Sequence, residues 1–147
     1  VEDVGGELQS LAFGVIRTQS GWALPRRLQA IHRAIAGLAR EWEPDSAAVE
    51  ELFFSSNVRT AMSVGQARGV VLLALADAGL AVSEYTPLVV KQAVTGFGRA
   101  DKRQVQEMVR LLLKLSKVPW PDDAADALAV AICHMNTSSW ATLGGVQ

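Results

Sequence analysis

Three acidic residues are the side chains of this chain best suited to chemistry. Asp123 and Asp126 lie three residues apart, and residues at i and i+3 share one face of a helix. Both carboxylates can therefore point the same way, near the end where the helix dipole is positive. A third carboxylate, Glu50, follows a short apolar run. If folding brings Glu50 against this pair, the oxygen ligands suit Mg²⁺, and such a site can hydrolyse a phosphodiester with two metals.

The aspartate pair alone is weak support for such a site, because Asp is ordinarily stabilising at a helix N-cap and in the first turn. The charge distribution adds to it. The segment from Thr86 to Pro119 carries seven basic and two acidic residues, while the whole chain has a net charge of -1. A basic face beside an acidic pocket suits a metal-dependent nuclease, because the basic side attracts a phosphodiester backbone. A solvated amphipathic helix is the alternative source of this charge run.

Composition predicts one globular domain. The chain has 147 residues, of which 50% are hydrophobic, enough for a real core. Its single cysteine, Cys133, excludes an internal disulfide framework and lies in an apolar run, so we interpret it as a core residue. Neither His32 nor His134 has metal-ligand spacing to a partner, so both have surface or structural roles. No apolar run is long enough to span a bilayer and no signal peptide is visible, so a cytoplasmic location without membrane contact is expected.

Strand-like and helix-like segments alternate along the chain. The patterns of apolar, glycine and proline residues predict, in order: a hairpin of Val1 to Val4 and Glu7 to Arg17 around Gly5-Gly6, a helix from Leu24 to Trp42, a buried strand from Ser46 to Glu51, a helix from Arg59 to Ala78, a strand from Ala81 to Tyr85, a helix begun by Thr86-Pro87 and ended by Gly96 and Gly98, a helix capped by Asp101 that carries Val105, Met108, Val109, Leu112 and Leu115, and a last helix from Asp122 to about Asn136. The order predicts an α/β layered domain with a mixed sheet.

Two further expectations follow from this pattern. Glu50 lies at the end of its strand, where ligands bind in such folds. Ala61, Gly65 and Gly69 form a stripe of small residues at i, i+4 and i+8, which favours close packing against another helix or a partner subunit. We expect residues 1–136 to form the folded domain and residues 137–147 to be a mobile tail.

Three segments of the chain resemble the RuvC family of bacterial Holliday-junction resolvases, which have the RNase H-like fold. They are Val49-Glu50-Glu51-Leu52-Phe53-Phe54 with Asn57 and Gly65-Gln66-Ala67-Arg68-Gly69, then Val90-Lys91-Gln92-Ala93-Val94-Thr95-Gly96-Phe97-Gly98 with Lys102 and Gln104-Val105-Gln106, then Asp123-Ala124-Ala125-Asp126-Ala127-Leu128-Ala129. Their order and spacing also fit, and the resemblance runs from about Val1 to His134. It implies an endodeoxyribonuclease that resolves four-way DNA junctions by paired cuts during recombination and repair.

The resemblance also implies roles for single residues. Glu50, Asp123 and Asp126 match metal-binding acidic positions of the family, with about two Mg²⁺ (or Mn²⁺) per site. Lys91 and Lys102 match family lysines near the active site. They would stabilise charge on the phosphate in the transition state or simply attract the backbone.

Other implications concern partners. Phe53 matches an aromatic residue that the family places at the junction crossover, although Phe53 or Phe54 alone would fit a core as well. We expect Arg99 and Arg103 to contact DNA with Lys91 and Lys102. The resemblance also implies a two-fold homodimer, which explains paired cuts, and a branch-migration motor as a partner.

One departure from the family concerns the start of the chain. The family begins with a strand that ends in Gly-Ile-Asp-Pro-Gly, whose aspartate is its first catalytic carboxylate, and this chain has no match to it. We therefore expect a fragment without the first strand, with one metal ligand fewer and poor turnover on its own. Two alternatives stay open: another RNase H-like nuclease that cuts RNA–DNA hybrids or processes ribosomal RNA, and a non-catalytic junction-binding fragment.

Overall fold

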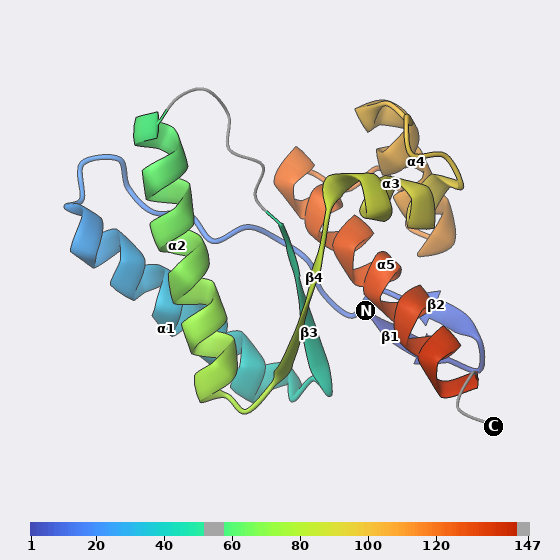
Figure 1. The fold of residues 1–147 in the computed structure, drawn as a ribbon, viewed down its shortest axis with the longest axis horizontal. Coiled ribbons are helices and arrows are strands. Elements are labelled where there is room, and N and C mark those ends of the chain that lie inside the picture. Colours follow the sequence, from blue (N-terminus) through green and yellow to red (C-terminus); the bar gives the residue numbers. More distant parts are fainter. Residues whose placement is uncertain (52–57, 144–147) are drawn as a thin grey trace. The chain divides into compact units, whose positions relative to one another are not determined.

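The computed structural model describes residues 1–51 and 58–143 (Figure 1). Its elements, in order, are β1 (Glu2–Val4), β2 (Glu7–Gln9), α1 (Leu24–Trp42), β3 (Ser46–Glu50), α2 (Val58–Asp77), β4 (Ala81–Tyr85), α3 (Pro87–Thr95), α4 (Lys102–Leu112) and α5 (Asp122–Leu143). The chain divides into two compact units. The first contains the described residues of Val1–Val15, Ala48–Glu51 and Glu84–Gln147, and the second those of Ile16–Ala47 and Leu52–Ser83.

The predicted hairpin is confirmed at its turn. β1 and β2 are antiparallel, with Glu2 opposite Gln9 and Val4 opposite Glu7. Gly5 and Gly6 join them with φ values of 67° and 89°, a conformation that glycine adopts at no steric cost and that two-residue hairpins require. The second strand ends at Gln9 rather than at the predicted Arg17, because the three residues of β1 offer no further partner.

The second unit contains the two long helices α1 and α2, which pack against each other. α1 has the predicted bounds, and α2 agrees with the prediction within one residue at each end. The apolar face of α1 is only partly covered, because Leu38 is 45% and Trp42 43% exposed. A Cβ added at Gly65 or Gly69 would meet nothing within 4 Å in the described part of the chain. The two glycines of the stripe therefore have room for a side chain among the described residues.

β3 and β4 form a second two-stranded sheet, separate from the hairpin. The backbone N–H of Glu51 donates to the carbonyl of Tyr85 at 2.8 Å, so the carboxyl ends of the two strands meet. The sequence predicted one mixed sheet, whereas the described strands form two separate pairs. The prediction that the first of these strands is buried was also wrong, because its residues are half-buried or exposed.

Three helices build the core of the first unit. Residues of α3, α4 and α5, with Ala100 and Leu113 from the turns that flank α4, supply its buried side chains, which are Val90, Val94, Ala100, Val105, Val109, Leu113, Leu128, Ala129, Val130, Ile132 and Cys133. Cys133 is 0% exposed, so its predicted place in the core is confirmed.

Local capping explains where α3 and α4 begin and end. Thr86 caps α3 as predicted and accepts from the N–H of Val89. Gly96, one of the two glycines predicted to end this helix, ends it in the left-handed region. Asp101 and Gln104 form a reciprocal capping box at the start of α4. The predicted core position Leu112 is 37% exposed, and Leu113 is buried instead, because α4 ends at Leu112 and the chain turns there.

α5 is longer than predicted, since it continues through Leu143 instead of ending at about Asn136. Proline is absent from residues 122–143, and the first glycine after Pro121 is Gly144, so nothing in this stretch is a strong helix breaker. The Thr137 hydroxyl donates to the carbonyl of Cys133 at 2.8 Å, a bond that a helical threonine can make. None of the described helices is both long and apolar enough to cross a membrane.

Candidate active site

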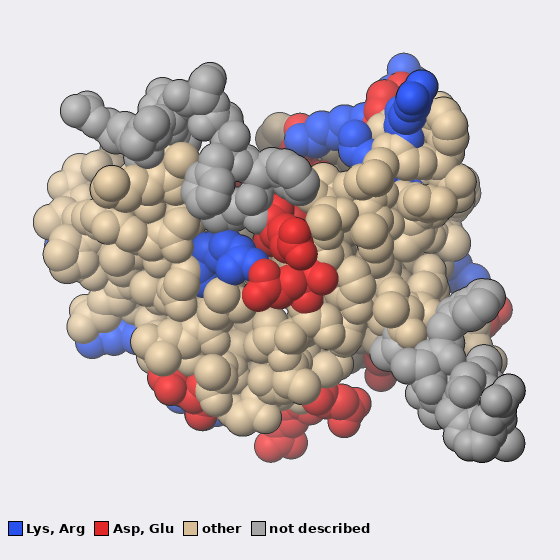
Figure 2. Space-filling model, in the orientation of Figure 1, with Lys and Arg blue, Asp and Glu red and all other residues tan. Residues whose placement is uncertain are grey.

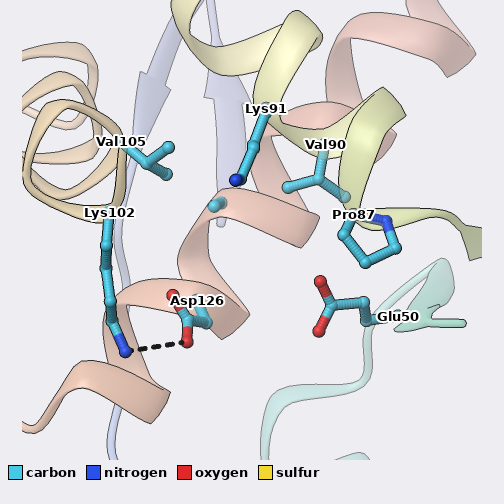
Figure 3. Close-up of a pocket in the computed structure, with 8 residues that line it drawn as sticks. Glu50, Pro87, Val90, Lys91, Lys102, Val105 and Asp126 are labelled. Atoms are coloured by element: carbon cyan, nitrogen blue, oxygen red, sulfur yellow. Dashed lines mark ion pairs between the residues drawn. The ribbon is translucent and has the colours of Figure 1, made fainter. Parts of the chain in front are cut away.

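A small pocket of about 80 Å³ lies in the first unit. Its lining residues are Glu50, Pro87, Val90, Lys91, Lys102, Val105, Asp126 and Ala129 (Figure 3). Glu50 is the last residue of β3, and Asp126 lies in the second turn of α5. The pocket is smaller than the roughly 300–1,000 Å³ of ordinary ligand sites, so it suits a small ion and water rather than an organic molecule.

The carboxylates of Glu50 and Asp126 face each other across this pocket (Figure 3). The pKa of Glu50 is raised above its ordinary value, first because burial disfavours its charge and then because Asp126 repels it. Glu50 is exposed as a whole residue, so the desolvation concerns the carboxyl group where it enters the pocket. A cation bound between these two carboxylates would relieve their repulsion.

Lys102 supplies one positive charge at this place. Its Nζ lies 3.0 Å from Oδ2 of Asp122 and 3.7 Å from Oδ2 of Asp126. The hydrogen bond to Asp122 is the largest cause that raises the pKa of Lys102, and the charges of Asp126, Asp122 and Asp123 raise it further. Lys102 is therefore firmly protonated. Since all these side chains are about half exposed, solvent screens each ion pair.

The structure brings together two of the three predicted metal ligands. Glu50 and Asp126 line the pocket, whereas Asp123 does not. Asp123 is exposed at the first turn of α5. In the two described segments, no group of three or more His, Cys, Asp or Glu residues is placed to hold a metal ion.

Asp122 is a site residue that sequence reasoning missed. It accepts from Nε2 of Gln106 at 3.0 Å and pairs with Lys102. These hydrogen bonds, that from Lys102 first, lower the pKa of the Asp122 carboxyl. A signal was present, because Asp122 and Asp126 are four residues apart and so share a helix face.

The residues predicted to contact DNA lie in different parts of the structure. Lys91 points its ammonium group into the pocket from α3 (Figure 3). Arg99 and Arg103 are exposed around the start of α4, as a DNA contact requires. Phe53, together with Phe54 and Asn57, lies outside the described residues.

Each of the two histidines contacts a polar side chain. Nδ1 of His134 lies 2.9 Å from the hydroxyl of Tyr85, so a hydrogen bond joins α5 to the end of β4. His32 lies 3.3 Å from Asp77. Both contacts agree with the predicted surface or structural roles.

The donor set fits a hard divalent cation. Mg²⁺ is typically held by one or two carboxylates together with waters and substrate phosphates. Glu50 and Asp126 supply two such carboxylates in one pocket, and their mutual repulsion is the kind that a cation relieves.

Comparisons with known proteins identify relatives along the whole chain. The family model described as "Crossover junction endodeoxyribonuclease RuvC" matches residues 1–134. A protein of that name from Rubrobacter xylanophilus is 56% identical over 146 residues, covering 99% of this chain and 82% of its own length. One from Chloroflexus aggregans is 57% identical over 138 residues, covering 94% of this chain and 84% of its own.

Solved structures agree with these sequence matches. A Thermus thermophilus RuvC structure superposes with a TM-score of 0.87 at 37% identity, covering 97% of this chain and 86% of that one. A structure of T. thermophilus RuvC in complex with Holliday junction substrate superposes with a TM-score of 0.83 at 34% identity, covering 91% of this chain and 81% of that one. The α/β, RNase H-like fold class expected from the sequence is thereby confirmed.

Proposed function

The chain belongs to the RuvC family of crossover junction endodeoxyribonucleases, and from this premise we propose that it resolves four-way DNA junctions by metal-dependent phosphodiester hydrolysis. The observation that carries the proposal is the pocket in which Glu50 faces Asp126 with two lysines beside them. The family match over residues 1–134 favours junction cleavage over the other RNase H-like activities, such as cutting RNA–DNA hybrids.

Glu50 and Asp126 are the proposed metal ligands. Asp123 is the proposed third ligand, because it precedes Asp126 by three residues and adds its charge to the same electrostatic network around Lys102. When bound, about two Mg²⁺ ions, or Mn²⁺ in their place, would lower the pKa of a water and stabilise the leaving oxygen. The carboxylates hold the charge that this chemistry requires, and a bound cation would relieve the repulsion from Asp126 that contributes to the raised pKa of Glu50.

Lys91 and Lys102 are the proposed phosphate-facing residues. Both line the pocket, so an incoming phosphodiester would meet two cations beside the two carboxylates. The Asp122 carboxylate holds Lys102 from the side, which limits the positions of the ammonium group before substrate arrives. Such a preorganised cation stabilises charge that develops on the phosphate.

We also propose that the protein acts as a two-fold homodimer. The open small-residue stripe at Gly65 and Gly69 supports this proposal, since small residues allow a second backbone to approach closely. A dimer would present two pockets to the two strands of a symmetric junction. A branch-migration motor is a further proposed partner, on the basis of the family resemblance alone.

The test of this function is the substitution Asp126→Asn. We expect junction cleavage in Mg²⁺ to fall by at least about 100-fold, because one ligand of the metal site is lost. We expect binding of a labelled four-way junction in Ca²⁺ to persist, because binding depends on the basic face. A matched control is Glu7→Gln, which removes a carboxylate that pairs with Lys114 and does not line the pocket.

Competition with linear duplex of the same sequence tests the choice of substrate. If the junction complex survives a large excess of duplex, the preference for four-way junctions holds. Equal competition by duplex would refute the resolvase function, and wild-type cleavage activity that survives Asp126→Asn would refute the proposed site.

A further inference from the structure

We propose that Phe97 is a DNA-contacting aromatic residue, which stacks on a base exposed beside the junction crossover while Arg99 and Arg103 hold the neighbouring phosphates. This inference rests on the proposed function. The residue lies between Gly96 and Gly98, in the turn that joins α3 to α4.

Phe97 is exposed although it is a large aromatic residue. It is 59% exposed, whereas most phenylalanines in a domain of this size are buried. An ordered turn, unlike a loose loop, holds an exposed ring in solvent, where its face is available to a binding partner.

Hydrogen bonds fix the turn that presents Phe97. The Thr95 hydroxyl accepts from the N–H of Phe97 at 3.1 Å and lies 2.8 Å from the carbonyl of Lys91. The N–H of Ala100 donates to the carbonyl of Phe97 at 3.0 Å. The ring is therefore carried on an ordered backbone, which reduces the entropy lost when it binds a partner.

Gly98 allows this turn to pack closely against α3. A Cβ at Gly98 would lie 2.7 Å from Cδ1 of Leu88, so the turn packs against the first turn of α3. That same part of α3 contributes Pro87 and Val90 to the acidic pocket. Phe97 and the proposed catalytic residues thus share one short helix as their support.

The surroundings of Phe97 favour DNA as the occupant. A second depression, of about 580 Å³, is lined by Thr95, Phe97, Ala100, Asp101, Arg103, Gln104, Glu107 and Met108. Lys102 lies between Asp101 and Arg103 in the sequence and lines the acidic pocket instead, so the start of α4 borders both hollows. Figure 2 shows lysine and arginine side chains, with acidic side chains among them, at the upper right, where Figure 1 draws α4.

Charge and aromatic character together match single-stranded or distorted DNA. Arg99 and Arg103 are exposed, and basic grooves with aromatic side chains hold the backbone while bases stack on the rings. Asp101 and Glu107 also line the depression, and Glu107 is paired with Arg110, so the positive charge offered to a phosphate comes from Arg99 and Arg103. A protein partner could pack against any large apolar side chain at this position, whereas base stacking requires an aromatic ring.

The experiment compares variants of Phe97 for binding to a four-way junction in Ca²⁺. Phe97→Ala and Phe97→Leu should raise the Kd by about tenfold, while Phe97→Tyr keeps a ring and should bind almost as the wild type does. A fluorescent base analogue at the crossover should lose its protein-dependent quenching in Phe97→Ala and keep it in Phe97→Tyr. The control is Leu111→Ala, which removes an apolar side chain on α4 that is 52% exposed.

The salt dependence of DNA binding distinguishes the contribution of the Phe97 ring from that of the arginines. Arg103→Ala should reduce the slope of log K against log salt by about 1, whereas Phe97→Ala should leave this slope unchanged. If Phe97→Leu binds as the wild type does, the contact is merely apolar and the proposal is overturned. Unchanged binding and quenching in Phe97→Ala would overturn it as well.

These outcomes are distinct from those of the proposed function. A wild-type protein that shows no preference for junctions over duplex would refute the function itself. A wild-type protein that selects junctions, with Phe97→Ala equal to it, would refute only the role of Phe97.

Discussion

Lys102 and Asp126 form an ion pair between α4 and α5, with 3.7 Å between Nζ and Oδ2. One of the two carboxylates of the acidic pocket therefore already has a cation beside it. The same ammonium group is shared with Asp122 at 3.0 Å, so Lys102 is held on one side of the pocket while Glu50 lies across from it (Figure 3). Burial and then repulsion from Asp126 raise the pKa of Glu50, whose carboxylate lies across the pocket from this ion pair.

Removal of the Lys102 charge should slow cleavage more than it weakens binding. For Lys102→Ala we expect the cleavage rate to fall by about 10- to 100-fold, because a preorganised cation is lost where charge develops. Single-turnover cleavage with saturating enzyme measures this rate without a contribution from binding. Lys117→Ala is the control, since Lys117 is an exposed lysine outside the pocket. Equal rates for the two variants would show that Lys102 acts only by backbone attraction.

Glu50→Gln should stabilise the metal-free protein at neutral pH. The pKa of Glu50 is raised above its ordinary value of 4.5 in the folded state. Its favourable contribution is therefore present below that value and is lost as the pH rises through the raised pKa. At pH 7 we expect Glu50→Gln to raise Tm by about 2 °C, and at pH 4 we expect no difference from the wild type.

Two comparisons check this stability prediction. Added Mg²⁺ should raise the Tm of the wild type and have a smaller effect on Glu50→Gln, because the variant lacks one carboxylate ligand. Glu7 gives the opposite sign, because its hydrogen bond with Lys114 lowers its pKa. Its contribution is present above the ordinary value and is lost as the pH falls, so Glu7→Gln should not stabilise at pH 7. A lower Tm for Glu50→Gln at pH 7 would contradict the proposed repulsion.

Asp101→Ala should destabilise the protein through α4. The Asp101 carboxylate accepts from the N–H of Gln104 at 2.9 Å, and the Gln104 side chain accepts from the N–H of Asp101 at 2.9 Å. Loss of such a cap costs about 1 kcal/mol, measurable as a shift in the urea midpoint with an unchanged m value. Asp101→Asn keeps an accepting oxygen and should recover most of the loss. If both variants unfold at the wild-type midpoint, the capping box contributes nothing.

Ile132→Ala should cost much more, because Ile132 is 0% exposed in the core of the first unit. Removal of its methyl and methylene groups leaves a cavity, which costs about 2–5 kcal/mol of unfolding free energy. Ile132→Val is the matched control, with an expected cost of about 0.5–1.5 kcal/mol. Urea unfolding of both variants measures the ratio, and equal small losses would mean that α5 is not packed in this core.

The elements that the sequence predicts well are those set by neighbouring residues. The bounds of α1 follow from an apolar face with a helical period, the hairpin turn follows from Gly5-Gly6, and the start of α3 follows from Thr86-Pro87. Each depends on local backbone conformation or on hydrogen bonds between residues a few positions apart, so the chain specifies them without tertiary contacts.

The predicted ends of elements are wrong where a partner element far along the chain sets the end, or where the local sequence carries no signal for it. The second hairpin strand stops at Gln9 because β1 is short, and α4 ends at Leu112, before the predicted helix position Leu115, with Leu113 rather than Leu112 buried. In both cases the predicted periodicity was continued past the point where its partner or its helix ends.

The acidic site shows the same division. The sequence and the family resemblance predicted Glu50, Asp126 and Lys102 as site residues: the spacing on α5 indicated Asp126, its place at the end of a strand indicated Glu50, and the resemblance implied Lys102. Only the tertiary structure decided that Glu50 faces Asp126, that Asp123 lies outside the pocket, and that Asp122 holds Lys102. These relationships join residues far apart in the chain, and their geometry depends on how β3, α4 and α5 pack, which no local pattern of residues determines.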